Sequence, residues 1–250
     1  MKTEDKMNKE LNITFEKDVK SNKWYHDLKY AVIPLLLTVI AIIFSYFFNM
    51  WWGKSTGAKP EIWIDKHIPL IPWFVYFYFF TFPMAAFLVF YLACTNKKMM
   101  YEIVLVEIIA LAISGVVYAV WQTEMVKPAF EAVTFTEKFV VATWNSTRPV
   151  NCLPSQHCFM ALACFIAMCG KNQERKIPVW FRLFIIFNSV MIILSTVFIK
   201  QHYILDFFAS LVIIVPLFFI VHAFKFGKKA NDFVEKTENI WREKRANKKK

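Results

Sequence analysis

The chain has 250 residues, of which 57% are hydrophobic and only 20% are charged, and its formal net charge is +11. Soluble domains have about half of their residues apolar and about a quarter charged. Here the apolar residues form long runs between short charged stretches, which is typical of a polytopic membrane protein and argues against a single soluble domain. The basic residues gather at both chain ends, beside apolar runs, so we expect them to contact anionic lipid headgroups rather than nucleic acid.

Six apolar runs are each near the ~20 residues that a helix needs to cross a hydrocarbon layer of ~30 Å. They cover residues 31–52, 71–94, 103–121, 154–169, 179–199 and 203–224, and the fourth is the shortest. The sequence therefore predicts an all-α fold: a bundle of six transmembrane helices within residues 31–224, with no internal repeat and no second domain.

Two polar segments flank this predicted bundle. Leu11, Phe15 and Val19 recur every four residues within residues 1–30, which is compatible with a helix lying on the membrane surface or with a solvated tail. Because mostly polar residues precede the first run, we expect that run to be an uncleaved anchor. Residues 225–250 are expected to form a basic cytoplasmic tail.

The distribution of lysine and arginine predicts the orientation in the membrane. When both ends are placed in the cytoplasm, most of the 30 basic residues fall in the inner regions, which are 1–30, 95–102, 170–178 and 225–250. Since cytoplasmic connections carry the excess of Lys and Arg, we predict that both termini are cytoplasmic. The Lys, Ile and Phe usage favours a bacterial cell membrane.

The turn between the fifth and sixth predicted spans carries a pair of residues that suits catalysis. His202 and Asp206 are four residues apart at the start of a helix, so their side chains share a face. A carboxylate there can accept the imidazole Nδ1 proton and leave Nε2 available as nucleophile or base. A charge inside an apolar span costs about 2.5–3.5 kcal/mol at the helix centre, so Asp206 needs a partner. The alternative is a purely structural pair that fixes the sixth helix.

A second polar group lies where the long connection 122–153 meets the fourth span. Ser155 and His157 fall in the first helical turn, where free backbone N–H groups and a hydroxyl suit an anion. Arg148 could bind two phosphate oxygens with its guanidinium, and Lys200 adds a positive charge beside His202. The alternatives are that His157 is a polar residue of the membrane interface and that Arg148 and Lys200 are headgroup anchors. Asp65, in the first outer connection, is expected to be solvated.

These residues resemble the motifs of the type 2 phosphatidic acid phosphatase superfamily of membrane phosphatases and phosphotransferases. That family carries Lys-x6-Arg-Pro, Pro-Ser-Gly-His and Ser-Arg-x5-His-x3-Asp. The matching residues here are Arg148 and Pro149; Pro154, Ser155 and His157; and Ser195, His202 and Asp206. The resemblance covers about residues 31–224 and implies a six-helix core whose site lies at the outer end.

Three positions depart from the family motifs. Val141 stands where the first motif has lysine, Gln156 where the second has glycine, and Thr196 where the third has arginine. Two cations of the expected phosphate site are therefore absent, and Lys200 or Lys138 is a candidate to replace them. The string from Lys200 to Asp206 resembles the branch of inositol-phosphotransferase and sphingolipid-synthase relatives.

The resemblance implies a mechanism. His202 attacks phosphorus, Asp206 holds its ring, and His157 protonates the leaving oxygen and then activates water. Arg148, Ser155, Gln156, Ser195 and Lys200 would contact the phosphate. The implied partner is a lipid phosphate, hydrolysed at the extracytoplasmic face.

Two other functions remain compatible with the sequence. One is a transferase that passes the phosphoryl headgroup to an acceptor hydroxyl, and the other is a non-catalytic membrane scaffold. The five cysteines have no Cys-x-x-Cys spacing, and three of them lie in one apolar run, so neither a disulfide framework nor a metal site is expected. We expect no cofactor.

Overall fold

The computed structural model describes residues 27–146, 148–169 and 177–247. Its first apolar run is one continuous helix, made of α2 (Lys29–Ile42), a π-helical segment η2 (Ile43–Phe48) and α3 (Asn49–Trp52). The helices that follow are η3 (Trp63–Lys66), η4 (Pro72–Phe74), α4 (Val75–Thr95), α5 (Lys97–Val120), α6 (Phe135–Asn145), α7 (Gln156–Cys169), α8 (Val179–Phe198), α9 (Ile204–Ala223) and α10 (Phe226–Asn247). Two isolated β-bridges are the extended pairings among the described residues, so the all-α prediction is confirmed.

Five helices are long and apolar enough to cross a membrane, and the count of six is not confirmed. They cover Lys29–Trp52, Pro72–Thr95, Lys97–Val120, Val179–Phe198 and Ile204–Ala223. The predicted fourth span contains α7, whose 14 described residues rise about 21 Å at 1.5 Å per residue. Most residues of α7 are buried, because the helix packs against α4, α5, α8 and α9. It lies within the bundle, surrounded largely by protein.

Apolar packing holds the helices around α7. One cluster of buried side chains joins α4, α5, α7 and α8, with Leu88, Met100, Met168 and Ile185 among its members. A second cluster joins α5, α7 and α9. The outward faces of the long helices remain apolar and exposed, as a surface in contact with lipid requires.

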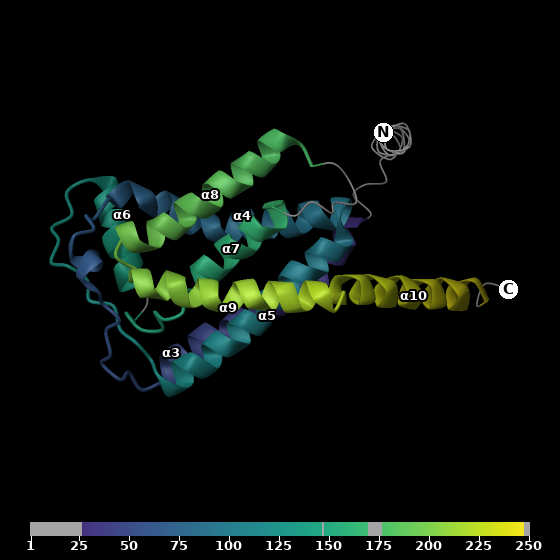
Figure 1. The fold of residues 1–250 in the computed structure, drawn as a ribbon, viewed down its shortest axis with the longest axis horizontal. Coiled ribbons are helices and arrows are strands. Elements are labelled where there is room, and N and C mark those ends of the chain that lie inside the picture. The colour runs from purple at the N-terminus through teal and green to yellow at the C-terminus, as the bar shows by residue number, and fades with distance from the viewer. Residues whose placement is uncertain (1–26, 147, 170–176, 248–250) are drawn as a thin grey trace.

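The two long connections, residues 53–74 and 121–155, gather at one end of the bundle, and α10 extends beyond the other end (Figure 1). The long connection before α7 contains a helix, α6, which the sequence analysis did not predict. Thr134 and Glu137 form a capping box at its start: the Thr134 hydroxyl accepts from the Glu137 N–H, and Glu137 Oε2 accepts from the Thr134 N–H at 2.7 Å. This local signal explains why α6 forms there.

The predicted C-terminal tail is mostly a helix, α10, that continues from α9 and packs against α5 (Figure 1). His222 Nδ1 lies 2.9 Å from Glu102 Oε2, which ties the end of α9 to α5. Glu238 accepts hydrogen bonds from Lys29 and Tyr30, so α10 also holds the start of α2. The predicted surface helix within residues 1–30 lies almost wholly outside the described residues.

The close crossing of α10 and α5 depends on Gly227. A Cβ at this position would lie 2.2 Å from the Lys98 carbonyl oxygen and 2.5 Å from Glu102 Cγ. We expect Gly227→Ala to push α10 away from α5 and to cost about 1–3 kcal/mol, as overpacking does. Thermal unfolding of the purified protein in detergent measures the loss, with the exposed neighbour Lys228→Ala as control. Equal melting temperatures for the two variants would contradict this account.

Candidate active site

The turn between α8 and α9 presents His202. The backbone N–H groups of Gln201 and His202 both donate to the Thr196 carbonyl, each at 2.9 Å, and Lys200 adopts a left-handed conformation with φ 55°. Trp144 of α6 donates its indole N–H to the Ile199 carbonyl at 2.8 Å. The turn is therefore fixed both by its own backbone and by the long outer connection.

His202 pairs with Asp206, as the four-residue spacing predicts. Nδ1 of His202 lies 3.1 Å from Asp206 Oδ2 and 3.0 Å from the Cys152 carbonyl oxygen. Because a carbonyl oxygen can only accept, Nδ1 carries the hydrogen in this contact, and Nε2 of the neutral ring then carries the lone pair. The ring is thus held in the tautomer that a nucleophile or general base requires.

Asp206 is fully buried and has two functions. Its Oδ2 accepts from the Tyr203 N–H at 2.9 Å, which caps the start of α9. Its Oδ1 makes no hydrogen bond among the described residues. A buried carboxylate needs hydrogen-bond donors, and Nδ1 of His202 and the Tyr203 N–H are the two that Oδ2 has among the described residues.

Asp65 is not solvated, contrary to the sequence-based expectation. Only 4% of the residue is exposed. Oδ1 accepts from the Ile204 N–H of α9 and Oδ2 from the Ile62 N–H, each at 2.9 Å. The expectation was wrong because the partner in α9 is distant in the sequence. Asp65 joins the connection between the first helix and α4 to the start of α9, the helix that carries Asp206.

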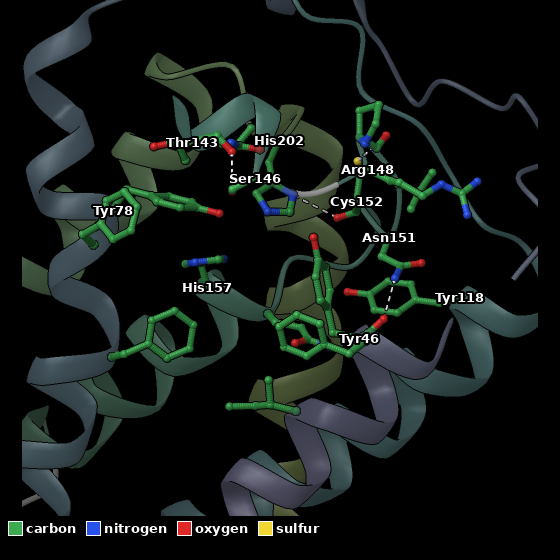
Figure 2. Close-up of a pocket in the computed structure, with 18 of the residues that line it drawn as sticks. Tyr46, Tyr78, Tyr118, Thr143, Ser146, Arg148, Asn151, Cys152, His157 and His202 are labelled. Carbon is green, nitrogen blue, oxygen red and sulfur yellow. Dashed lines mark hydrogen bonds between the residues drawn. The ribbon is translucent and has the colours of Figure 1, made fainter. Parts of the chain in front are cut away.

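His157 lies in the first turn of α7, facing His202. The two ring centroids are 6.1 Å apart. Tyr78 of α4 stacks on the His157 ring at 4.0 Å, and Phe82 packs edge-on at 5.4 Å, which fixes the orientation of the ring. Among the described residues His157 makes no hydrogen bond, so its nitrogens are available to a ligand. Figure 2 shows both imidazoles in the same pocket.

The pocket is a cavity of about 310 Å³ between the first helix, α4, α5, α7 and the outer connection. His157 and His202 line it together with Arg148, Gln156, Lys127, Gln201 and several aromatic side chains. Rings with centroids 6.1 Å apart leave room for a reacting atom between them. Such an atom can lie about 3–3.5 Å from a nitrogen of one imidazole, while an oxygen bonded to it lies within hydrogen-bonding distance of the other imidazole. The arrangement suits transfer of a small group with acid–base assistance.

Two of the predicted phosphate ligands, Arg148 and Lys200, donate hydrogen bonds to backbone carbonyls of other segments. Arg148 lines the cavity, but Nη1 donates to the Met50 carbonyl at 2.7 Å and the guanidinium points away from the imidazoles (Figure 2). Nζ of Lys200 donates to the carbonyls of Asp65 and Ile68, at 3.1 and 2.6 Å. Burial lowers the pKa of Lys200. Lys200 lines a different cavity, of about 530 Å³, which His202 also lines.

The other four candidates also occupy defined places. Ser155 is buried, and its hydroxyl accepts from the Cys158 N–H at 3.3 Å, which caps α7. Ser195 is buried and donates to the Ile192 carbonyl within α8. Gln156 lines the cavity and donates to Ser45 Oγ at 2.9 Å, while Lys138 is exposed on α6 and does not line the cavity. The structure brings Gln156 together with the histidines, and Ser155, Ser195 and Lys138 lie outside the cavity lining.

Sequence reasoning missed other residues of the cavity. Lys127 comes from the outer connection, and Tyr78 and Tyr118 from apolar helices where an aromatic residue is unremarkable. Asn151 holds the Cys152 segment: Nδ2 donates to the Tyr46 carbonyl at 3.0 Å, and Oδ1 accepts from Gln122 at 2.7 Å. The length of the connection 122–153 was the only sequence signal for Lys127 and Asn151.

Comparison with known families identifies the family of the chain. Residues 100–230 match the sequence profile of the PAP2 superfamily, which is more than half of the chain and includes both histidines and Asp206. The chain belongs to the PAP2 superfamily. No curated protein and no solved structure gives a significant match. Membership of the PAP2 superfamily implies lipid phosphatase or phosphotransferase activity, which family members perform without a metal.

The Asp206 carboxylate can be tested by the change Asp206→Asn. The amide keeps an oxygen that can accept from the Tyr203 N–H, but the negative charge beside His202 is lost. We expect turnover of a lipid phosphate to fall by at least about 100-fold, because the charge stabilises the cationic ring. The control is Asp232→Asn, at an exposed position on α10. Unchanged turnover in Asp206→Asn would contradict the assigned function of the pair.

The Asp65 contacts predict an effect on stability. Asp65→Ala leaves the N–H groups of Ile204 and Ile62 without their acceptor and should destabilise the protein by about 1–2 kcal/mol, as loss of a helix cap does. Asp65→Asn retains one oxygen and should lose less. Thermal unfolding in detergent measures both, and the exposed Lys66→Ala is the control. A melting temperature for Asp65→Ala equal to that of the control would rule out the capping function.

Proposed function

We propose that this chain is a membrane lipid phosphatase that hydrolyses a phosphomonoester or pyrophosphate lipid through a phosphohistidine on His202. The observation that carries the proposal is the pair of imidazoles, 6.1 Å apart across one cavity, with Nδ1 of His202 donating to Cys152 and Asp206. This arrangement leaves Nε2 of His202 as the nucleophile and His157 as the proton donor and acceptor.

The reaction proceeds in two steps. In the first, Nε2 of His202 bonds to phosphorus, the bond from phosphorus to the lipid oxygen breaks, and His157 gives a proton to that oxygen. The negative phosphate favours the protonated form of His157 when it binds. In the second, His157 takes a proton from water, the water oxygen bonds to phosphorus, and the phosphorus–nitrogen bond breaks. Inorganic phosphate leaves, and both imidazoles return to their first state.

A lipid substrate is favoured because the cavity reaches the surface that faces the membrane. Phe47 of the first helix and Phe79 and Phe82 of α4 line the cavity, and each is also more than two-fifths exposed on the outside of the bundle. A lipid can therefore place its phosphate between the histidines while its chains remain among these aromatic side chains. A soluble phosphate ester gains nothing from such an opening.

The site lies at the extracytoplasmic face in this proposal. The basic residues concentrate on the connections and ends at the other face, where the positive-inside rule places the cytoplasm. Both termini are then cytoplasmic, and the two cavities that meet at His202 open toward the outer half of the membrane.

A transfer reaction is the second candidate. It is favoured by the second cavity of about 530 Å³ that His202 lines, where Lys59, Glu61 and Tyr203 offer polar groups to an acceptor hydroxyl that replaces water. The resemblance of the Lys200–Asp206 string to inositol-phosphotransferase-like relatives points the same way. In that reaction His157 would deprotonate the acceptor hydroxyl.

A panel of substrates tests the proposal. Purified protein in detergent is assayed for phosphate release from phosphatidate, phosphatidylglycerophosphate and a polyprenyl pyrophosphate, with glycerol phosphate as the soluble comparison. We expect release from at least one lipid, and a loss of at least about 1,000-fold in His202→Ala and His157→Ala. His67→Ala is the matched control, because His67 packs against Trp63 in the connection before α4 and does not line the cavity.

Three results would count against hydrolysis through His202. The first is undiminished release by His202→Ala, and the second is failure to trap an acid-labile phosphoprotein in the wild type. The third is transfer of a labelled headgroup to a second lipid without phosphate release, which would establish the transferase instead.

A further inference from the structure

The cavity contains a cation that no family motif supplies. The phosphate of a monoester carries close to two negative charges at neutral pH, which must be compensated in a site with membrane on one side. The guanidinium of Arg148 is bonded to the Met50 carbonyl and points away from the imidazoles (Figure 2), and the ammonium of Lys200 is bonded to the carbonyls of Asp65 and Ile68. Neither of these charges is directed at the space between the imidazoles.

Lys127 is placed differently. It lines the same cavity as His157 and His202. Its Nζ donates to the Lys200 carbonyl at 2.7 Å and to Gln201 Oε1 at 2.8 Å, so the ammonium lies against the two residues that precede His202. An ammonium has three N–H groups, and the third remains for a ligand.

Both partners of Lys127 are neutral. Among the described residues no carboxylate lies within 4.0 Å of its ammonium, although Asp206 and Cys152 act on it from a greater distance. Burial lowers the pKa of Lys127 to about 8, and the negative charge of Asp206 opposes part of that effect. An amine that is desolvated without a counter-ion is costly to charge, and a bound anion would remove that cost.

We propose that Lys127 binds the phosphate group of the substrate and replaces the cations that the family motifs have lost at Val141 and Thr196. The proposal deepens the proposed function and rests on it for the lipid, but its central claim concerns binding of a phosphate dianion next to the two imidazoles. Lys127 also ties the outer connection to the His202 turn, so a bound phosphate would hold these two segments together.

Binding of inorganic phosphate to the full-length protein in detergent tests this directly, because no turnover is needed. Isothermal titration compares the wild type with Lys127→Met, Lys127→Arg and the control Lys54→Met, at an exposed lysine of the first outer connection. We expect Lys127→Met to weaken binding at least about 10-fold, while Lys127→Arg stays within about threefold and Lys54→Met matches the wild type. Thermal unfolding of each variant identifies any misfolded preparation, and retained binding in Lys127→Arg distinguishes lost charge from lost structure.

A pH series tests whether phosphate affinity follows the charge of Lys127, which it would not do if this lysine had only a structural function. Phosphate is already a dianion above about pH 7.5, so weakening of wild-type binding up to about pH 9.5 should follow the loss of the ammonium charge, approaching tenfold per unit above the pKa. Lys127→Arg should lose much less, since guanidinium stays charged. The other titratable or charged groups that line the cavity or act on Lys127 are Asp206, His202, His157, Arg148, Cys152, Tyr46, Tyr78 and Tyr118, and burial raises the pKa of the Cys152 thiol.

The outcomes separate this inference from the proposed function. Binding that depends on Lys127 in a protein that hydrolyses no lipid supports the inference and contradicts the phosphatase. Lipid hydrolysis together with equal phosphate affinity in wild type and Lys127→Met overturns the inference and leaves the phosphatase standing. A wild-type protein that binds no phosphate at millimolar concentration also overturns the inference.

Discussion

The hydrogen bonds of the His202 ring at Nδ1 are the interaction on which the site depends. A carbonyl from the outer connection and a carboxylate from α9 meet at one ring nitrogen and determine which nitrogen carries the proton. The same Asp206 carboxylate caps the first turn of α9, so one side chain fixes both the start of this helix and the orientation of the His202 ring.

The long connections are held in place by hydrogen bonds from their polar side chains to backbone groups of other segments. Asp65, Trp144 and Asn151 each reach a backbone group of a distant segment: Ile204, Ile199 and Tyr46, respectively. Buried backbone groups without water must find such partners. These contacts hold the turn before α9 against the connections and convert the end of a helical bundle into a cavity with a defined lining.

The cavity joins two environments. Aromatic side chains of the first helix and α4 form the part that faces lipid, and lysine, glutamine and the two imidazoles form the part that suits phosphate. The π-helical segment η2 lies at this boundary, where Ser45 accepts a hydrogen bond from Gln156 of α7. Local departures from α-helical geometry are frequent at functional sites. A substrate with an apolar chain and a charged headgroup matches this division.

The amino-acid sequence by itself determined the long apolar helices, the all-α class and the pairing of His202 with Asp206, because hydrophobic run length and four-residue spacing are local properties. It also identified both histidines through motifs whose order is readable along the chain. It predicted that the fourth span is short, but not that α7 is enclosed by other helices, that Asp65 is buried as a cap, or that residues after 225 form a helix packed on α5. Only the tertiary structure decided these, and only it placed Lys127 in the lining of the cavity that holds both imidazoles, while the charged groups of Arg148 and Lys200 bond to carbonyl oxygens. The physical reason is that a long side chain takes its direction from whichever acceptors the fold places nearby, and those acceptors come from segments remote in the sequence.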